Sequence, residues 1–407
     1  MKKIFLSLLS LTSLTASAQF GARENPTVPS VTENVTEDFK PASTNQENKQ
    51  FPAVNSQRMV RAQIVAPNAT TVKLDISGTK YLMVKDADGK WTGTSAPQDE
   101  GFHYYQLEID GASVPDPNSL YYYGASRWGS GIEIPSDDQD FWQVKNVPQG
   151  SVSEVFYWST YTEKMRRCHV YLPAEYFTNP TKKFPVLYLQ HGMGENEYGW
   201  AQQGHTAQIM DNLIAEGKAV PCIIVMDNGL NTSRPGEQGG FGGFGGQRPQ
   251  GQRPQGAPGQ GGPRRGGFGG FSEGFKNVLF NDIIPMVEKN YRVIADPQHR
   301  AYAGLSMGGM QAREITLANP EKFAYVGSFS SGAWNVDQVK ASEGFAKNVK
   351  LLFMSGGGKE NMGCEAAAKS IHDQLGMNAV GYESPGTAHE WHTWRRSLYQ
   401  FAQLIFK

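Results

Sequence analysis

Short segments of alternating apolar and polar residues fill the chain from Arg58 to about Gln149. They read MVRAQIVAP, TTVKLDIS, KYLMVKD, KWTGTS and HYYQLEID. Alternation with a period of two is typical of strands that bury one face. Asp-Gly pairs that begin at Asp88 and Asp110 suit the tight turns between such strands. The pattern therefore predicts an all-β antiparallel sandwich over residues 56–149.

From residue 150 the pattern changes to buried strands that alternate with helices. Two hairpin-like strands, EVFYWST and RRCHVYLP, precede FPVLYLQHG and PCIIVMDNG, which are apolar throughout, as in strands covered on both faces. Helical segments are expected at residues 208–216, 273–291, 365–375 and 390–406, and Pro285 predicts a kink or restart in the second. This order predicts an α/β domain over residues 150–407, with a doubly wound, mostly parallel sheet of about eight strands.

Three segments lack this periodicity. Residues 1–18 join a lysine pair, an apolar run and a small-residue exit, the features of a secretory signal peptide. Residues 19–55 are rich in Thr, Asn, Glu and Pro, and we expect a disordered tether there. Residues 235–271 repeat Gly, Gln, Arg and Pro and predict a flexible insertion, either a mobile rim of a substrate cleft or an idle segment.

Charge and cysteine content narrow the class of protein. The chain has 38 Lys and Arg against 39 Asp and Glu, which argues against nucleic acid or an acidic membrane as partner. No cysteine follows the signal to carry a lipid, and no later apolar run approaches the roughly 18 residues of a membrane span. We therefore expect a periplasmic or secreted protein. Cys168, Cys222 and Cys364 are too few for a disulfide framework and are expected to be small buried residues.

A candidate nucleophile lies where an apolar run meets a Gly-rich corner. Gly304-Leu305-Ser306-Met307-Gly308 matches G-x-S-x-G, with a predicted strand before it and a predicted helix after it. In that setting a strained turn lifts the serine hydroxyl clear of the sheet. Side chains at Gly304 and Gly308 would collide where the chain doubles back. Ser306 is therefore the predicted nucleophile.

A serine nucleophile needs a histidine base, and the fold with this motif, the α/β-hydrolase fold, orders the chain Ser, acid, His. Among the histidines after Ser306, His372 falls inside a predicted helix. His389 sits in the loop before the last predicted helix, where this fold places its base, and His392 follows one turn later. We favour His389, with His392 packing or lining the cleft.

The acid should follow the strand KLLFMSGG. Glu360 comes first after the glycines and is preferred. Glu365 is better placed to open the next helix, where its charge suits the helix dipole. Asp337, after the preceding strand, is the third possibility, because some relatives of the fold place the acid there.

The oxyanion of an acyl-transfer intermediate needs two backbone donors. One is expected to be the amide of Met307, and the other should come from the loop His191-Gly192-Met193-Gly194. His191 itself is expected to support that loop rather than to react. No metal or cofactor is predicted, because the histidines, including His205, lack the paired spacing of a zinc site.

Several blocks of the second domain resemble the esterase D and feruloyl-esterase group of serine carbohydrate esterases. These are MRRCHVYLPAEY, FPVLYLQHGMGENEYGW, NDIIPMVEKNYRV, HRAYAGLSMGGMQA and GTAHEWHTWRRSLYQF. The resemblance implies Ser306 as nucleophile, His389 as base and the amide of Met193 as second oxyanion donor. The family's acid is usually an aspartate in G-x-x-D, and here Glu360 stands at that place.

The first domain resembles the glycogen-binding-type, immunoglobulin-like modules that precede many polysaccharide-active enzymes. The blocks are APNATTVKLDISG, KDADGKWTG and FHYYQLEIDGASVPDPNS. Its aromatic residues are expected either to stack on sugar or, more often, to fill the core and the seam with the next domain: Trp91, Tyr104, Tyr105, Tyr121, Tyr122, Tyr123 and Trp128.

Together these features predict an exported serine esterase, and the family resemblance implies action on feruloyl or acetyl esters of plant-wall polysaccharide such as arabinoxylan. Trp200, Trp391 and Phe271 are candidates for contacting an aromatic acid, with core packing as the alternative for each. Two other functions stay open. One is hydrolysis of a siderophore of the enterobactin type or another small ester, and the other is non-catalytic glycan binding on an esterase scaffold.

Overall fold

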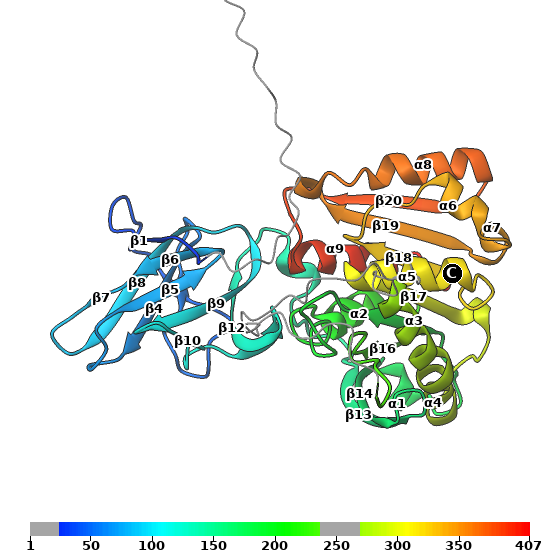
Figure 1. Ribbon diagram of the computed structural model, residues 1–407, viewed down its shortest axis with the longest axis horizontal. Helices are drawn as coiled ribbons and strands as arrows, with labels where there is room; N and C mark the ends of the chain where they lie inside the picture. Colours follow the sequence, from blue (N-terminus) through cyan, green and yellow to red (C-terminus); the bar gives the residue numbers. More distant parts are fainter. Residues whose placement is uncertain (1–23, 237–268) are drawn as a thin grey trace, which may run out of the picture.

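A computed structural model describes residues 24–236 and 269–407, with side chains in the second range from residue 272 onward. It contains a β-sandwich, on the left in Figure 1, and an α/β domain on the right. The predicted signal peptide and residues 237–268 of the predicted insertion lie outside the described residues.

The sandwich consists of two sheets that enclose an apolar core of residues such as Val72, Leu74, Leu107 and Ile132. Within the described residues, one sheet has the order β1 (Thr27–Pro29), β6 (Thr79–Leu82), β5 (Val72–Ile76), β9 (Gly101–Ile109), β12 (Arg127–Ile134) and β11 (Tyr121–Gly124), with β10 (Ala112–Val114) paired to β9. The other has the order β2 (Lys40–Pro41), β3 (Ala53–Val54), β4 (Met59–Val65), β8 (Lys90–Pro97) and β7 (Val84–Lys85).

The tether expected at residues 19–55 was wrong for residues 24–55, which belong to the sandwich. Strand β1 pairs in parallel with β6, and β2 and β3 extend the second sheet. Val28 and Val31 pack against the sandwich core, and Ala42 is buried in it. These few apolar side chains suffice because the backbone groups of the segment pair with the edges of existing sheets.

The α/β domain is built on a sheet whose strands alternate their side chains between two buried layers. In the described part of the chain this sheet has eight strands, as expected, in the order β13 (Ser151–Ser159), β14 (Lys164–Leu172), β16 (Ile223–Asp227), β15 (Val186–Gln190), β17 (Arg300–Leu305), β18 (Tyr325–Phe329), β19 (Leu351–Gly357) and β20 (Ala379–Ser384). Strand β14 is antiparallel to both of its neighbours, whereas the strands from β16 to β20 are parallel.

Helices cover both faces of this sheet, as a doubly wound fold requires. They are α1 (Glu175–Thr178), α2 (Thr206–Ala215), α3 (Gly269–Val278), α4 (Ile284–Asn290), α5 (Met307–Ala318), α6 (Val336–Ala341), α7 (Phe345–Asn348), α8 (Cys364–Leu375) and α9 (Trp391–Ala402). Short 3₁₀ turns occupy residues 139–141, 297–299 and 358–360. The helix expected at 273–291 is interrupted by a π-helical turn at Leu279–Ile283, and it restarts with Pro285 in the first turn of α4, as predicted.

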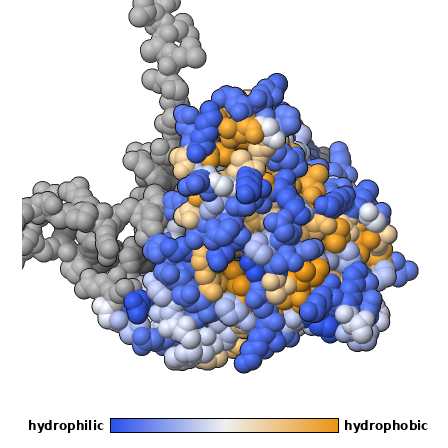
Figure 2. All heavy atoms as spheres, turned by 90° about the vertical axis from the view of Figure 1, so that its right-hand side faces the viewer, coloured by the Kyte–Doolittle hydropathy of each residue, from blue (hydrophilic) through white to orange (hydrophobic). Residues whose placement is uncertain are grey.

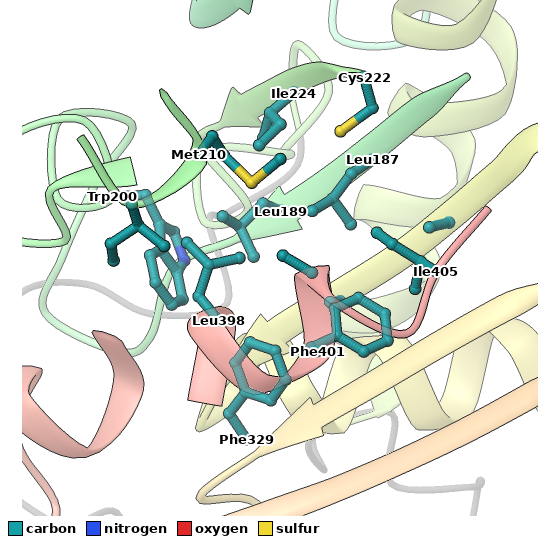
Figure 3. Close-up of a cluster of buried hydrophobic side chains, with 14 of the residues drawn as sticks. Leu187, Leu189, Trp200, Met210, Cys222, Ile224, Phe329, Leu398, Phe401 and Ile405 are labelled. Carbon is teal, nitrogen blue, oxygen red and sulfur yellow. The ribbon is translucent and has the colours of Figure 1, made fainter. Parts of the chain in front are cut away.

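One face of the sheet packs against α2 and α9, and Figure 3 shows this core. Leu187 and Leu189 of β15 point toward Met210 of α2 and toward Leu398 and Phe401 of α9. The opposite face packs against α3 and α4 through a second cluster that includes Phe275, Val278 and Val287. Cys168, Cys222 and Cys364 are buried and free, as expected.

The surface of the α/β domain that faces away from the sandwich is mostly hydrophilic, with apolar areas between the polar ones (Figure 2). Among the described residues, no helix combines the length and apolar character needed to cross a bilayer.

The two domains are joined by buried polar contacts. Both oxygens of Glu133 on β12 accept hydrogen bonds from the guanidinium of Arg395 on α9, at 2.7 and 2.9 Å. Phe102 of β9 lies in the same apolar cluster as Trp391 and Trp394 of α9. The sandwich therefore packs directly on the last helix of the α/β domain.

Candidate active site

The predicted nucleophile occupies a sharp turn between β17 and α5. Ser306 has φ 72° and ψ −105°, a strained conformation for a residue with a side chain. A Cβ on Gly304 would lie 2.5 Å from the carbonyl carbon of Gly308, and one on Gly308 would lie 2.6 Å from the carbonyl oxygen of His191. Backbone atoms cannot yield as a flexible side chain can, so the close approach that forms this turn requires glycine at both positions.

The three predicted catalytic side chains lie within hydrogen-bond reach of one another. Nε2 of His389 lies 3.0 Å from Oγ of Ser306, and Nδ1 of His389 lies 2.7 Å from Oε1 of Glu360. A carboxylate at Nδ1 favours the tautomer with the proton on that nitrogen, which leaves Nε2 free to accept the serine proton. The His389 side chain is 48% exposed, whereas that of Glu360 is 8% exposed. The predicted base is thus open to solvent, while the predicted acid is shielded from it.

Glu360 is held in a preformed site at the end of β19. Its second oxygen, Oε2, accepts hydrogen bonds from the hydroxyl of Ser330 at 2.6 Å and from the amide of Gly357 at 2.7 Å. Burial acts to raise the pKa of Glu360, but hydrogen bonds from His389, Ser330 and Gly357 outweigh it and hold the pKa below its ordinary value. Glu360 is therefore ionised near neutral pH, as an orienting carboxylate must be.

Within the described residues, none of the other candidates for acid and base hydrogen-bonds to Ser306. Asp337 and Glu365 are exposed on α6 and α8. His372 is exposed on α8, and its Nδ1 lies 3.0 Å from the carbonyl oxygen of Met377. His392 is buried, and burial lowers its pKa to about 4. Packing was one of the two roles expected for His392, the other being to line the cleft.

His191 supports the loop that follows β15, as expected. Its ring is buried, and burial lowers its pKa to about 4, so the imidazole is neutral near neutral pH. Nδ1 donates to the carbonyl oxygen of Gly192 at 2.7 Å, and Nε2 accepts from the amide of Gly229 at 3.1 Å. The ring thereby ties the loop after β15 to the loop after β16.

The expected oxyanion donors come from two segments that meet at the nucleophile, the loop after β15 and the first turn of α5. A Cβ on Gly192 would lie 3.3 Å from Cβ of Ser306, so the loop that carries Met193 passes directly beside the serine. Met307 follows Ser306 as the first residue of α5. Within the described part of the chain, neither amide donates to a protein acceptor.

The sandwich reaches this same loop. The amide of Ser126, in the turn between β11 and β12, donates to the carbonyl oxygen of Gly194 at 2.8 Å. Tyr104 of β9 places its hydroxyl 3.0 Å from both oxygens of Glu195 and accepts a hydrogen bond from Nε1 of Trp391. Burial raises the pKa of Glu195 to about 8. The first domain therefore contributes to the wall of the candidate site.

Two of the three candidates for contacting an aromatic acid are buried in the core. Trp200 is 1% exposed and Trp391 is 2% exposed, and their rings pack edge to face in the core with centroids 5.4 Å apart. Trp200 also donates from Nε1 to the carbonyl oxygen of Gln190. The alternative of core packing is the correct one for both. Phe271 lies in α3, but its side chain is outside the described residues.

Most aromatic residues of the sandwich fill its core or the seam, as the pattern favoured. Trp91 and Tyr105 are buried in the sandwich, and Tyr104 and Tyr122 pack against the core of the α/β domain. Tyr121 and Trp128 remain exposed.

Two residues that contact the candidate triad Ser306–His389–Glu360, Ser330 and Trp394, were not predicted from the sequence. Ser330 follows β18 with φ 48°, accepts a hydrogen bond from Nε1 of Trp394 at 3.0 Å and donates to Glu360. Trp394 also packs edge to face against His389, with centroids 5.2 Å apart. No motif marks Ser330 for this role, because FAYVGSFSS has the pattern of an ordinary strand end. For Trp394, the second Trp of the block GTAHEWHTW was the available signal.

No cluster of His, Cys, Asp or Glu that could hold a metal ion occurs among residues 24–236 and 269–407.

The sheet order, the strained serine turn and the sequence order Ser306, Glu360, His389 define an α/β-hydrolase.

Comparison with known proteins specifies the family. The family model described as putative esterase matches residues 159–404, more than half of the chain. The chain is 41% identical over 382 residues to an endo-1,4-beta-xylanase/feruloyl esterase of Xylanibacter ruminicola, an alignment that covers 91% of this chain and 48% of that protein. The chain therefore belongs to this family of esterases, enzymes that hydrolyse carboxylic esters, and spans about half the length of that relative.

Two solved structures share the fold. A ferulic acid esterase of Anaeromyces mucronatus matches with 22% identity and a TM-score of 0.51, over 67% of this chain and 96% of that chain. The enterobactin esterase of Shigella flexneri matches with 15% identity and a TM-score of 0.57, over 85% of this chain and 92% of that chain. At these identities the likeness shows the fold alone.

Proposed function

We propose that the protein is a serine esterase that releases feruloyl, related hydroxycinnamoyl or acetyl groups from plant-wall polysaccharide such as arabinoxylan. The observation that carries this proposal is the hydrogen-bonded relay Ser306–His389–Glu360. The substrate class rests on the 41% identity to a protein described as a xylanase/feruloyl esterase. No cofactor takes part in the proposed reaction.

In the first half of the reaction, Oγ of Ser306 attacks the ester carbonyl carbon while Nε2 of His389 takes the hydroxyl proton. The negative charge moves to the carbonyl oxygen, where the amides of Met307 and Met193 would donate to it. The bond between the acyl carbon and the sugar oxygen then breaks, and protonated His389 gives its proton to the departing sugar oxygen. The acyl group remains on Ser306.

In the second half, a water molecule attacks the acyl carbon while His389 takes a proton from that water molecule. Collapse of the new tetrahedral intermediate breaks the bond to Ser306, which recovers its proton, and releases the free acid. Through both halves Glu360 keeps the proton on Nδ1 of His389 and stabilises the imidazolium that forms. Ser330 and Gly357 hold Glu360 in place for that role.

We expect this activity outside the cytoplasm, in the periplasm or the medium, because the first residues have the features of a signal peptide. The sandwich would assist by holding sugar, since its turn residue Ser126 contacts the loop beside Ser306 and its Trp128 is exposed. An isolated sandwich that shows no retardation in a xylan or glucan affinity gel would remove this part of the proposal.

A substrate panel tests the proposal against the two alternatives. The purified protein is assayed on methyl ferulate, acetylated xylan and a catecholate siderophore, with Ser306→Ala as the blank. Turnover of the first or second substrate supports the proposal, whereas turnover of the siderophore alone supports the small-ester function. A protein that turns over none of them, resists an active-site phosphonate label and still binds xylan would be a glycan-binding protein.

A further inference from the structure

Exposed aromatic side chains form a row on the outer face of the β13–β14 hairpin and continue onto the sandwich. Phe156 is 60% exposed, and Trp158, two residues on along the same face of β13, is 57% exposed. Trp128 on β12 of the sandwich is 46% exposed. Tyr198, half-buried in the loop after β15, contacts side chains of both domains. We call Trp158, Phe156, Tyr198 and Trp128 the aromatic row.

The two ends of the row are joined through Tyr198, which contacts Trp128 of the sandwich and Arg167 of the hairpin. The rings of Trp128 and Tyr198 meet edge to face with centroids 5.2 Å apart. The guanidinium of Arg167 lies 4.8 Å from the centre of the Tyr198 ring, and Arg167 is the cross-strand partner of Phe156. Since cross-strand partners share a face, the row runs continuously from the hairpin to the sandwich.

The β13–β14 hairpin projects from the sheet at the carboxyl ends of the parallel strands, where the candidate nucleophile also lies. Cys168 of β14 pairs with Asp227, the last residue of β16, so residues 164–167 of the antiparallel β14 extend beyond the carboxyl end of β16. Ser306 follows the carboxyl end of β17, which is parallel to β16 through β15. The carboxyl ends of parallel strands lie together at one end of the sheet, so the hairpin tip and Ser306 lie at that same end.

The sandwich end of the row lies next to the oxyanion loop. Trp128 is two residues beyond Ser126, whose amide donates to Gly194 at 2.8 Å. Gly192 of the same loop lies beside Ser306. A long ligand on the row would therefore pass close to the reacting bond.

The charges along the row do not favour a polyanion. Arg167 is paired with Glu197 at 2.5 Å and with Glu154 at 3.4 Å, and Glu154 also accepts a hydrogen bond from the hydroxyl of Tyr198 at 2.6 Å. The positive charge of Arg167 is thus offset by two carboxylates beside the row. Flat apolar rings with polar groups already oriented between them suit a neutral sugar chain, whose C–H faces stack on aromatic rings and whose hydroxyls accept and donate hydrogen bonds.

We propose that the aromatic row binds the sugar backbone of the ester substrate, so that the polysaccharide lies across both domains and presents its acyl group to Ser306. The proposal deepens the proposed function and rests on it for the identity of the ester. It assigns to Phe156 and Trp158, on the catalytic domain itself, a role in binding polymer that the sandwich alone would not fill.

The test compares one small and one polymeric substrate. The double variant Phe156→Ala/Trp158→Ala is measured beside Phe177→Ala, which removes an aromatic ring of equal exposure (59%) on α1, away from the row. The double variant should keep kcat/KM for methyl ferulate within about twofold and lose about three- to tenfold in kcat/KM for feruloylated arabinoxylan, mainly through KM. The Phe177 variant should match wild type on both substrates.

Binding without turnover separates this proposal from the proposed function. Ser306→Ala should be retarded by arabinoxylan in an affinity gel, and adding Phe156→Ala/Trp158→Ala should abolish most of that retardation. If wild type fails on every feruloyl or acetyl ester while this difference in retardation persists, the proposed function falls and the row stands. Equal loss on small and polymeric substrates, no loss on either, or a halved molar mass in light scattering for the double variant would overturn the row as a sugar site, the last by assigning the face to a second copy.

Discussion

Arg395 of α9 and Glu133 of β12 form a bidentate ion pair in which both side chains are buried, at 5% exposure or less. Because α9 begins at Trp391, directly after the loop that carries His389, this pair anchors the segment behind the base to the sandwich. The first domain is therefore part of the structure that positions the candidate site.

Replacing Glu133 by Ala should destabilise the protein by about 3–5 kcal/mol, because Arg395 would keep its charge in a buried site without a partner. Urea denaturation followed by tryptophan fluorescence measures the change. Glu100→Ala is the matched control, since its ion pair with Arg58 is exposed and should contribute less than about 1 kcal/mol. Equal stability of the Glu133 variant and wild type would contradict a supporting role for this contact.

Replacing Glu360 by Gln should lower kcat on methyl ferulate by roughly a thousandfold to ten-thousandfold. The amide can donate to Nδ1 of His389, which favours the tautomer that cannot accept the proton of Ser306. Glu365→Gln serves as the control, because Glu365 is exposed on α8 and should leave kcat unchanged. The reverse order of effects would move the role of acid to Glu365.

Glu195 should make stability fall as pH rises through the neutral range. Burial raises its pKa from 4.5 to about 8, so between these values the unfolded chain has lost a proton that the folded chain keeps. Its contribution is complete below pH 4.5 and is lost as pH rises through about 8. Thermal unfolding from about pH 5 to about pH 9 should show a shallower decline for Glu195→Gln than for wild type. Parallel curves would contradict this assignment.

The three side chains that meet in the candidate site could be picked out from the sequence because each follows a local signal. The turn at Ser306 needs glycines at fixed neighbours, and Glu360 and His389 follow strand ends that the apolar pattern marks. Because those strands are parallel, their carboxyl ends bring the three side chains to the same end of the sheet.

The supporting contacts were not predictable from such signals. Ser330 and Glu360 are joined only because β18 and β19 are neighbours, and Tyr104 meets Glu195 across the seam between the domains. Residues 24–55 looked too polar to fold because their strands gain stability from sheets formed by other segments. A bulky aromatic such as Trp200 has the same sequence signature in a core as in a cleft, and only its packing distinguishes them.

The most direct test of the account is methyl ferulate hydrolysis by wild type and Ser306→Ala, with thermal unfolding of both. The account predicts turnover by wild type, no turnover above the uncatalysed rate by the variant, and stabilities within about 1 kcal/mol of each other. A folded Ser306→Ala variant that still hydrolyses the ester at the wild-type rate would contradict the assignment of Ser306 as the nucleophile.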